Sequence, residues 1–180
     1  LTNQYESDEE KVGNITVNGQ GLFGFGINAA AIGEEGSEVF LDSTNNILVQ
    51  DSSISTVGSG EIGNITLLAD ETVRVLSSTP FSSFAGISSS IDPGGNCGGG
   101  DIRSFADNLE VLNGAQLSAS SFGQGTAGNV EINIRETALF DGVRFLTVPS
   151  IAVSNIEAGS MGTGGEVRIT AQNLEVLNGA

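Results

Sequence analysis

Carboxylates are the side chains of this 180-residue sequence with the greatest capacity for chemistry. The chain has 22 Asp and Glu against 6 Lys and Arg, and no His. Hydrolysis of a polysaccharide requires two acids about 5–10 Å apart, and the densest acidic clusters are Asp8-Glu9-Glu10, Glu34-Glu35 and Asp70-Glu71. Their spacing places no arginine beside them, and Arg135 and Glu136, as neighbours on a strand, would face opposite ways. We therefore expect no enzyme and assign no catalytic residue, and the absence of His excludes a Ser–His–Asp triad.

A calcium site is the second chemistry that acidic residues could support. The calcium-binding solenoid repeat reads Gly-Gly-x-Gly-x-Asp-x-apolar-x. The nearest match is Gly98-Gly99-Gly100-Asp101, whose glycine spacing differs and which does not recur every nine residues. The sequence also has no Asp-x-Asp-x-Asp-Gly loop. We predict no metal ligand and no cofactor, and a calcium-binding array stays as an alternative.

Cys97 and two Asn-x-Thr motifs are the remaining candidates. Cys97 lies among glycines, either as an exposed thiol that links chains or as a small loop residue, which we favour. Asn14-Ile15-Thr16 and Asn64-Ile65-Thr66 match the glycosylation sequon. Each lies where a corner leads into a strand, so we interpret both as a turn residue followed by β-branched strand residues. Because Asn14, Asn64 and Asn129 share a position in the repeat described below, we predict a ladder of stacked amides that satisfies backbone groups at this corner.

The net charge of −16 excludes several partners. Five arginines and one lysine cannot form the basic stripe that binds nucleic acid or an anionic membrane surface. No run of 18 apolar residues is present, so we expect no membrane insertion. The 26 glycines, together with Ile and Val separated by Ser, Thr and Asn, favour short strands with tight corners.

An internal repeat determines the elements that position these residues. Residues 108–115 and 173–180 have the same sequence, Asn-Leu-Glu-Val-Leu-Asn-Gly-Ala, 65 residues apart. Extended backwards, residues 100–115 match residues 165–180 at 11 of 16 positions. A repeated unit cannot bury its apolar face alone and stacks on its neighbours.

A shorter signature, Gly-polar-Ile or Gly-polar-Val, marks the start of each unit. Residues 1–12 form an acidic lead-in, the end of a preceding coil or loop, and residues 13–180 form coils that start near Gly13, Gly36, Gly63, Gly100, Gly128 and Gly165. We predict about five coils plus a partial one, cut from a longer array. The glycine-rich segments 92–100, 121–127 and 157–165 are predicted to be outer loops, and 77–85 and 143–150 to be excursions. The apolar run 21–32 is predicted to pack in the core.

Each unit contains three runs with the two-residue period of a strand. In the unit that starts at Gly100, Arg103 lies on the outer side, and one inner face carries Ile102, Ser104, Ala106, Leu109, Val111, Leu117 and Ala119. Asp107-Asn108 and Asn113-Gly114 lie between the runs and tolerate left-handed backbone angles. Three strands and three corners predict one coil of an all-β solenoid, with coils ~4.8 Å apart.

The residues themselves resemble a known family. Residues 108–130, Asn-Leu-Glu-Val-Leu-Asn-Gly-Ala-Gln-Leu-Ser-Ala-Ser-Ser-Phe-Gly-Gln-Gly-Thr-Ala-Gly-Asn-Val, are similar to the repeats of filamentous-haemagglutinin-like exoproteins of two-partner secretion systems, in their cyanobacterial version. Gly21-Leu22-Phe23-Gly24 is also similar to segments of that family. The resemblance covers most of residues 13–180.

The resemblance implies a right-handed single-stranded parallel β-helix (β-solenoid) that is secreted and displayed at the cell surface. It implies an outer-membrane transporter as the partner during export, a structural and adhesive role, a cell-surface or glycan ligand, and no catalytic residues. The family's secretion domain carries Asn-Pro-Asn motifs, whereas this chain has no Asn-Pro. We therefore expect the export signal to lie outside this piece. A polysaccharide-active β-helix enzyme and a calcium-binding solenoid are the alternatives.

Overall fold

The computed structural model describes residues 13–19, 26–31, 36–78, 85–145 and 147–180. Within these residues every regular element is a β strand, and the strands pair in parallel except in one two-stranded hairpin. This confirms the predicted all-β class with parallel strands in stacked sheets. The acidic clusters at residues 8–10 and 34–35 lie outside the described residues.

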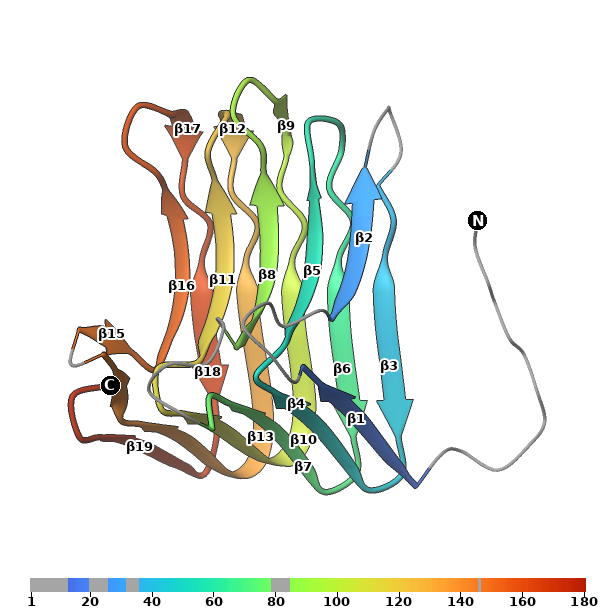
Figure 1. Ribbon diagram of the computed structural model, residues 1–180, viewed down its shortest axis with the longest axis vertical. Coiled ribbons are helices and arrows are strands. Elements are labelled where there is room, and N and C mark those ends of the chain that lie inside the picture. The colour runs from blue at the N-terminus through green and yellow to red at the C-terminus, as the bar shows by residue number, and fades with distance from the viewer. Residues whose placement is uncertain (1–12, 20–25, 32–35, 79–84, 146) are drawn as a thin grey trace.

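Most of the strands lie in three columns, which we call face one, face two and face three (Figure 1), and the short strands described below lie outside them. Face one contains β3 (Val39–Ser43), β6 (Ile65–Ala69), the first halves of β10 (Ile102–Leu112) and β13 (Val130–Asp141), and β18 (Val167–Thr170). Face two contains β1 (Asn14–Asn18), β4 (Asn46–Gln50), β7 (Thr72–Leu76), the second halves of β10 and β13, and β19 (Asn173–Leu177). Face three contains β2 (Ile27–Ala31), β5 (Ser53–Gly58), β8 (Gly86–Ile91), β11 (Gln116–Ser121) and β16 (Ile151–Ile156).

The chain passes along face one, face two and face three in turn, and we call each such pass a rung. The register between rungs follows the glycine signature, since Ile102 pairs with Val130 and Val130 pairs with Val167. These partners are 28 and 37 residues apart, as are the glycines that precede them. The longer rung that includes β13 accommodates its extra residues in an antiparallel hairpin, β14 (Val143–Arg144) with β15 (Val148–Pro149). Most of the other predicted excursion, residues 79–84, lies outside the described residues.

The inward side chains of the three faces form the core, because alternate residues of a strand point to one side. The predicted register is confirmed, since each of the following is no more than 3% exposed: Ile102, Ser104, Ala106, Leu109, Val111, Leu117 and Ala119. Arg103 lies on the outer side, and Glu110 forms an ion pair with Arg74 there. Of the apolar run 21–32, Ile27 and Ala29 pack against the core, and residues 21–25 and 32 are not described.

The predicted start of a coil at Gly13 is wrong. β1 pairs with β4 on face two, so that Asn14 lies beside Asn46, whereas Asn64 stands at the start of face one. Asn14 and Asn64 therefore do not share a position. The short signature fits both corners because each requires a small residue followed by a polar one before an inward Ile or Val.

Two predicted breaks also differ in the structure. β10 continues through Asp107 with a register shift between Ala106 and Asn108, so this corner is a bulge within one bent strand.

The glycine-rich loops each contain a short strand, and β9 (Asn96–Gly98), β12 (Gln124–Thr126) and β17 (Met161–Thr163) pair in parallel. The glycine-rich composition gave no sign of these strands, because hydrogen bonds between backbone groups hold them together and these bonds do not depend on side chains. Asn113 and Gly114 do have left-handed angles, φ 56° and 78°, as the sequence predicted.

Close backbone contact between rungs explains the glycine that begins the signature. A Cβ atom at Gly100 would lie 2.1 Å from the carbonyl oxygen of Gly63, and one at Gly128 would lie 2.0 Å from that of Gly100. A Cβ at Gly165 would lie 2.3 Å from the Gly128 oxygen. We call Gly63, Gly100, Gly128 and Gly165 the glycine column. Each member is glycine because any side chain would push two rungs apart.

We predict that Gly128→Ala destabilises the fold by about 1–3 kcal/mol or more, because backbone atoms must shift to admit the methyl group. Gly98→Ala is the matched control, since a Cβ there meets nothing within 4 Å. Urea unfolding followed by circular dichroism measures both free energies. Equal stability of the two variants would contradict the close contact in the glycine column.

The buried serines differ in whether their hydroxyl groups have partners. Ser104 is 1% exposed and its Oγ has no hydrogen-bond partner. Ser150 is equally buried, but its Oγ accepts a hydrogen bond from the Gly114 N–H at 2.9 Å and donates to the Asp141 carbonyl at 2.8 Å. A buried polar group without a partner costs about 1–3 kcal/mol.

We predict opposite effects of alanine at these two positions. Ser104→Ala removes an unpaired hydroxyl and should raise the free energy of unfolding by about 1 kcal/mol. Ser150→Ala leaves the buried Gly114 N–H without its partner and should lower it by about 1–3 kcal/mol. Thermal or urea unfolding tests the pair. A loss of stability in Ser104→Ala would mean that its hydroxyl is bonded in solution.

Candidate functional site

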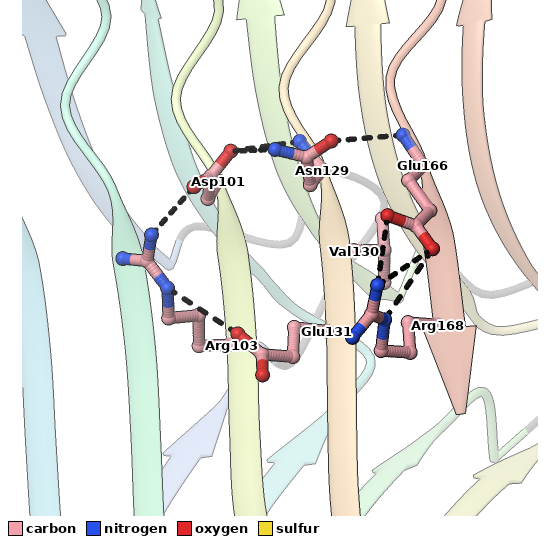
Figure 2. Close-up of a pocket in the computed structure, with 7 residues that line it drawn as sticks. All are labelled: Asp101, Arg103, Asn129, Val130, Glu131, Glu166 and Arg168. Atoms are coloured by element: carbon pink, nitrogen blue, oxygen red, sulfur yellow. Dashed lines mark hydrogen bonds and ion pairs between the residues drawn. The ribbon is translucent and has the colours of Figure 1, made fainter. Parts of the chain in front are cut away.

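The outer surface of face one over β10, β13 and β18 gathers most of the charged side chains that could act together. A shallow hollow of about 280 Å³ lies there, between three consecutive rungs. Figure 2 shows the side chains that line it, and the dashed lines run from Glu131 through Arg103, Asp101, Asn129 and Glu166 to Arg168. We describe these side chains as two rows. One row holds Asp101, Asn129 and Glu166, and the other holds Arg103, Glu131 and Arg168.

The first row is a ladder of backbone-capping side chains. The Oδ1 atom of Asn64 accepts a hydrogen bond from the Asp101 N–H at 2.8 Å. Asp101 Oδ1 accepts one from the Asn129 N–H, and Asn129 Oδ1 accepts one from the Glu166 N–H, each at 2.8 Å. Each side chain thus satisfies the corner of the next rung. Asn64 and Asn129 share this corner and cap backbone groups as predicted, but Asp101 lies between them, so the two amides do not stack on each other. Asn14 does not belong to the ladder and accepts a hydrogen bond from Asn46 on face two.

The second row alternates positive and negative charge. Arg103 donates to Asp101 at 2.5 Å, and its Nε lies 3.7 Å from Glu131. Arg168 forms an ion pair with Glu166 at 3.1 Å. The side chain of Arg103 is 34% exposed and that of Arg168 is 65% exposed. Pairs this open to water contribute little to stability.

A second hollow of similar size adjoins the first, further along the same strands. It is lined by Leu68, Asp70, Phe105, Asn133, Arg135 and Thr170, among others. Arg135 donates to the Asp107 carboxylate and, at 2.8 Å, to the Asp70 carbonyl oxygen. The hydrogen bond that Arg135 donates to the Asp107 carboxylate raises the pKa of the Arg135 guanidinium, so it stays charged. The ring of Phe105 therefore lies on the same outer surface as the charged side chains of both rows.

The sequence interpretation missed these arginine–carboxylate contacts. It placed no arginine beside the acidic clusters, whereas Arg135 reaches Asp70 in the structure. Asp107 with Arg135, and Arg103 with Glu131, are one rung apart at 28 residues, and Arg103 with Asp101 is a pair on a single strand. The rung spacing of 28 and 37 residues was visible in the sequence and could have found them. A second signal was the repetition of Gly-acid-apolar-Arg at Gly100 and at Gly165.

This arrangement is suited to binding polar groups. Arg103 lies between two carboxylates and Arg168 holds a third, so two positive charges face three negative ones and most of the charge is compensated locally. Asp101, the acid of the calcium-like motif, accepts hydrogen bonds from Asn129 and Arg103. Among the described residues no group of three His, Cys, Asp or Glu side chains could hold a metal ion.

Cys97 is partly buried on β9, where it packs against Ile62 and Ile91. Burial raises the pKa of its thiol, and the negative charge of Glu61 raises it further. A raised pKa lowers the fraction of reactive thiolate at neutral pH. The environment therefore disfavours an exposed linking thiol, and it places Cys97 on a short strand instead of the loop that we predicted.

No protein-family model, no curated protein and no solved structure matches this chain. In the part of the chain that the structure describes, no helix is long and apolar enough to cross a bilayer.

We predict that Cys97 reacts with a maleimide more slowly in the folded protein than in the urea-unfolded chain at the same pH, near 8. The raised pKa leaves less thiolate at that pH, and the rate should climb as pH increases through the raised value. Absorbance of a chromogenic maleimide gives both rates. Equal rates would show that Cys97 is exposed.

Proposed function

We propose that this chain is a non-catalytic segment of a right-handed parallel β-helix with a structural and adhesive role. The observation that carries the proposal is the unbroken parallel pairing of every rung with the next across three faces. Parallel strands joined by a crossover are right-handed in nearly all known cases. Such a stack is a quasi-one-dimensional scaffold that presents long flat surfaces to partners.

The outer surfaces support an adhesive role. Face one presents paired charges, and the five strands of face three contain no charged residue at all. A protein of net charge −16 repels other polyanions at long range, so the uncharged face three and the largely compensated charges of face one are where a partner can approach. The resemblance to filamentous-haemagglutinin-like exoproteins adds export through an outer-membrane transporter and display outside the cell to the proposal.

Adhesion of coated particles tests this function. Beads that carry the folded chain should adhere to a cell or matrix surface, whereas beads that carry the urea-unfolded chain should not. Single-bead detachment force under flow is the measurement. Detachment at the same force for folded and unfolded chains would refute an adhesive role for the folded surface.

One observation favours the enzyme alternative, namely the convergence of Glu131 and Glu166 with Arg103 and Arg168 on face one. A polysaccharide-active enzyme would place such groups around its substrate. Incubation with polyuronides, followed by assay of new reducing ends and of unsaturated products, tests it. Product formation that Arg103→Gln abolishes would replace the adhesive proposal with a catalytic one.

A further inference from the structure

The two hollows of face one form one continuous surface. Outward side chains follow one another at every second residue, so Phe105 is next to Arg103 along β10, and Asn133 is next to Glu131 along β13. From Asp101 to Asp107 this surface is about 20 Å long, and three rungs make it about 10 Å wide. An elongated ligand can therefore contact both hollows at once.

The chemistry of this surface is an alternation of donors and acceptors around an aromatic ring. The guanidinium groups of Arg103, Arg135 and Arg168 are donors only, and the neighbouring carboxylates are acceptors only. Phe105 is partly exposed between Leu68 and Asn133 in the adjoining rungs. Sugar hydroxyl groups donate and accept at the same time, and the C–H face of a sugar ring packs against an aromatic face.

We propose that this surface binds a chain of uncharged sugars, with one sugar ring on Phe105 and its hydroxyl groups between the arginines and the carboxylates. This inference rests on the proposed adhesive role and names its ligand. The ligand lies across the outer side of β10, β13 and β18. Arg103 and Arg168, which are equivalent residues of the 65-residue repeat, contact different parts of it.

Electrostatics decide against an anionic glycan. The two hollows hold Arg103, Arg135 and Arg168, but the acids Asp70, Asp101, Glu131 and Glu166 also line them. Every arginine in them already faces a carboxylate, and the molecule as a whole carries −16. A sulfated or uronic-acid chain would be repelled at long range and would have to displace these ion pairs.

The backbone decides against a peptide strand. Peptides that extend a sheet bind to an open edge, where main-chain groups are free. β10 and β13 are each paired on both sides, so their backbone is not available. In the described residues β18 is paired only with β13, and its free edge lies on the side away from the hollows. Recognition on this surface must come from side chains.

The size of the surface implies weak binding at each site. Hollows of about 280 Å³ are smaller than the ~300–1,000 Å³ pockets that enclose small ligands. An adhesive array gains strength from many weak contacts, because linked sites raise the effective concentration of each next contact. We expect dissociation constants in the millimolar range for a single segment and short oligosaccharides.

A ¹H–¹⁵N NMR titration of the 180-residue chain tests the proposal. The probes are uncharged gluco-, manno- and xylo-oligosaccharides, with oligogalacturonate and heparin fragments as anionic probes. Uncharged probes should shift the arginine Nε–H signals and the amides of β10, β13 and β18. Phe105→Ala and Arg168→Gln should each raise the dissociation constant roughly threefold to tenfold.

Two matched variants serve as controls. Phe40→Ala removes an aromatic side chain that is 62% exposed on the same face but does not line the hollows. Arg74→Gln breaks an arginine–glutamate pair on face two. Neither should change the dissociation constant. Arg168 is exposed, so Arg168→Gln keeps the fold even if Phe105→Ala does not, and thermal melting identifies that case.

Three results would overturn the inference. They are no shift with any uncharged probe, preferential binding of the anionic probes, and equal weakening by Phe105→Ala and Phe40→Ala. The bead assay separates this inference from the adhesive function. If beads with Phe105→Ala adhere as strongly as wild type, the adhesive function stands and the sugar site is refuted. If the chain binds sugars but the beads do not adhere, the sugar site stands and the adhesive function is refuted.

Discussion

The stacking distance between rungs is the constraint on which the rest of this structure depends. Parallel strands pair ~4.8 Å apart. At the start of face one the rungs approach so closely that the carbonyl oxygen of one column glycine occupies the position where the column glycine of the next rung would carry a Cβ atom. The oxygen of Gly100 and the Cβ that Gly128 lacks would be 2.0 Å apart. Only glycine keeps these rungs in contact, and with them the register of the strands that follow.

That register decides which side chains meet on the surface. Once Val130 is aligned with Ile102, Glu131 must lie beside Arg103, and Asn129 must lie beside Asp101. The same alignment puts Arg135 next to Asp107, across the bulge of β10. The polar surface of face one is therefore a consequence of backbone stacking, and its charged pairs contribute more to the character of the surface than to its stability.

The core and the surface obey different rules along the same strands. Inward positions accept side chains of different size and polarity, so that Ser104 and Ile132 share one column and Leu109 lies on Ala138. Outward positions are free of that limit and differ between faces, with paired charges on face one and small uncharged side chains on face three. A scaffold of this kind can change what it binds without changing how it folds.

The sequence alone was sufficient for the local rules of this fold. The strand period identified the inward residues of residues 100–119 correctly, because alternation by two is a property of the single strand. The left-handed corner at Asn113-Gly114 was equally local. Gly13 was misplaced because its signature looks the same at two different corners, and the short strand β12 was missed because backbone groups of neighbouring rungs create it.

What the tertiary structure decided is clearest in the repeated octapeptide. Leu109 and Val111 are 0% exposed, whereas Leu174 and Val176, in the identical segment, are 54% and 56% exposed. In the described structure β10 has rungs on both sides and β19 has one on a single side only. Sequence determined the strand, its inward face and its corner, because these follow from the residue types and their period. Burial, and the meeting of arginines with carboxylates a rung away, came from the neighbours, because they depend on which segment lies above and below.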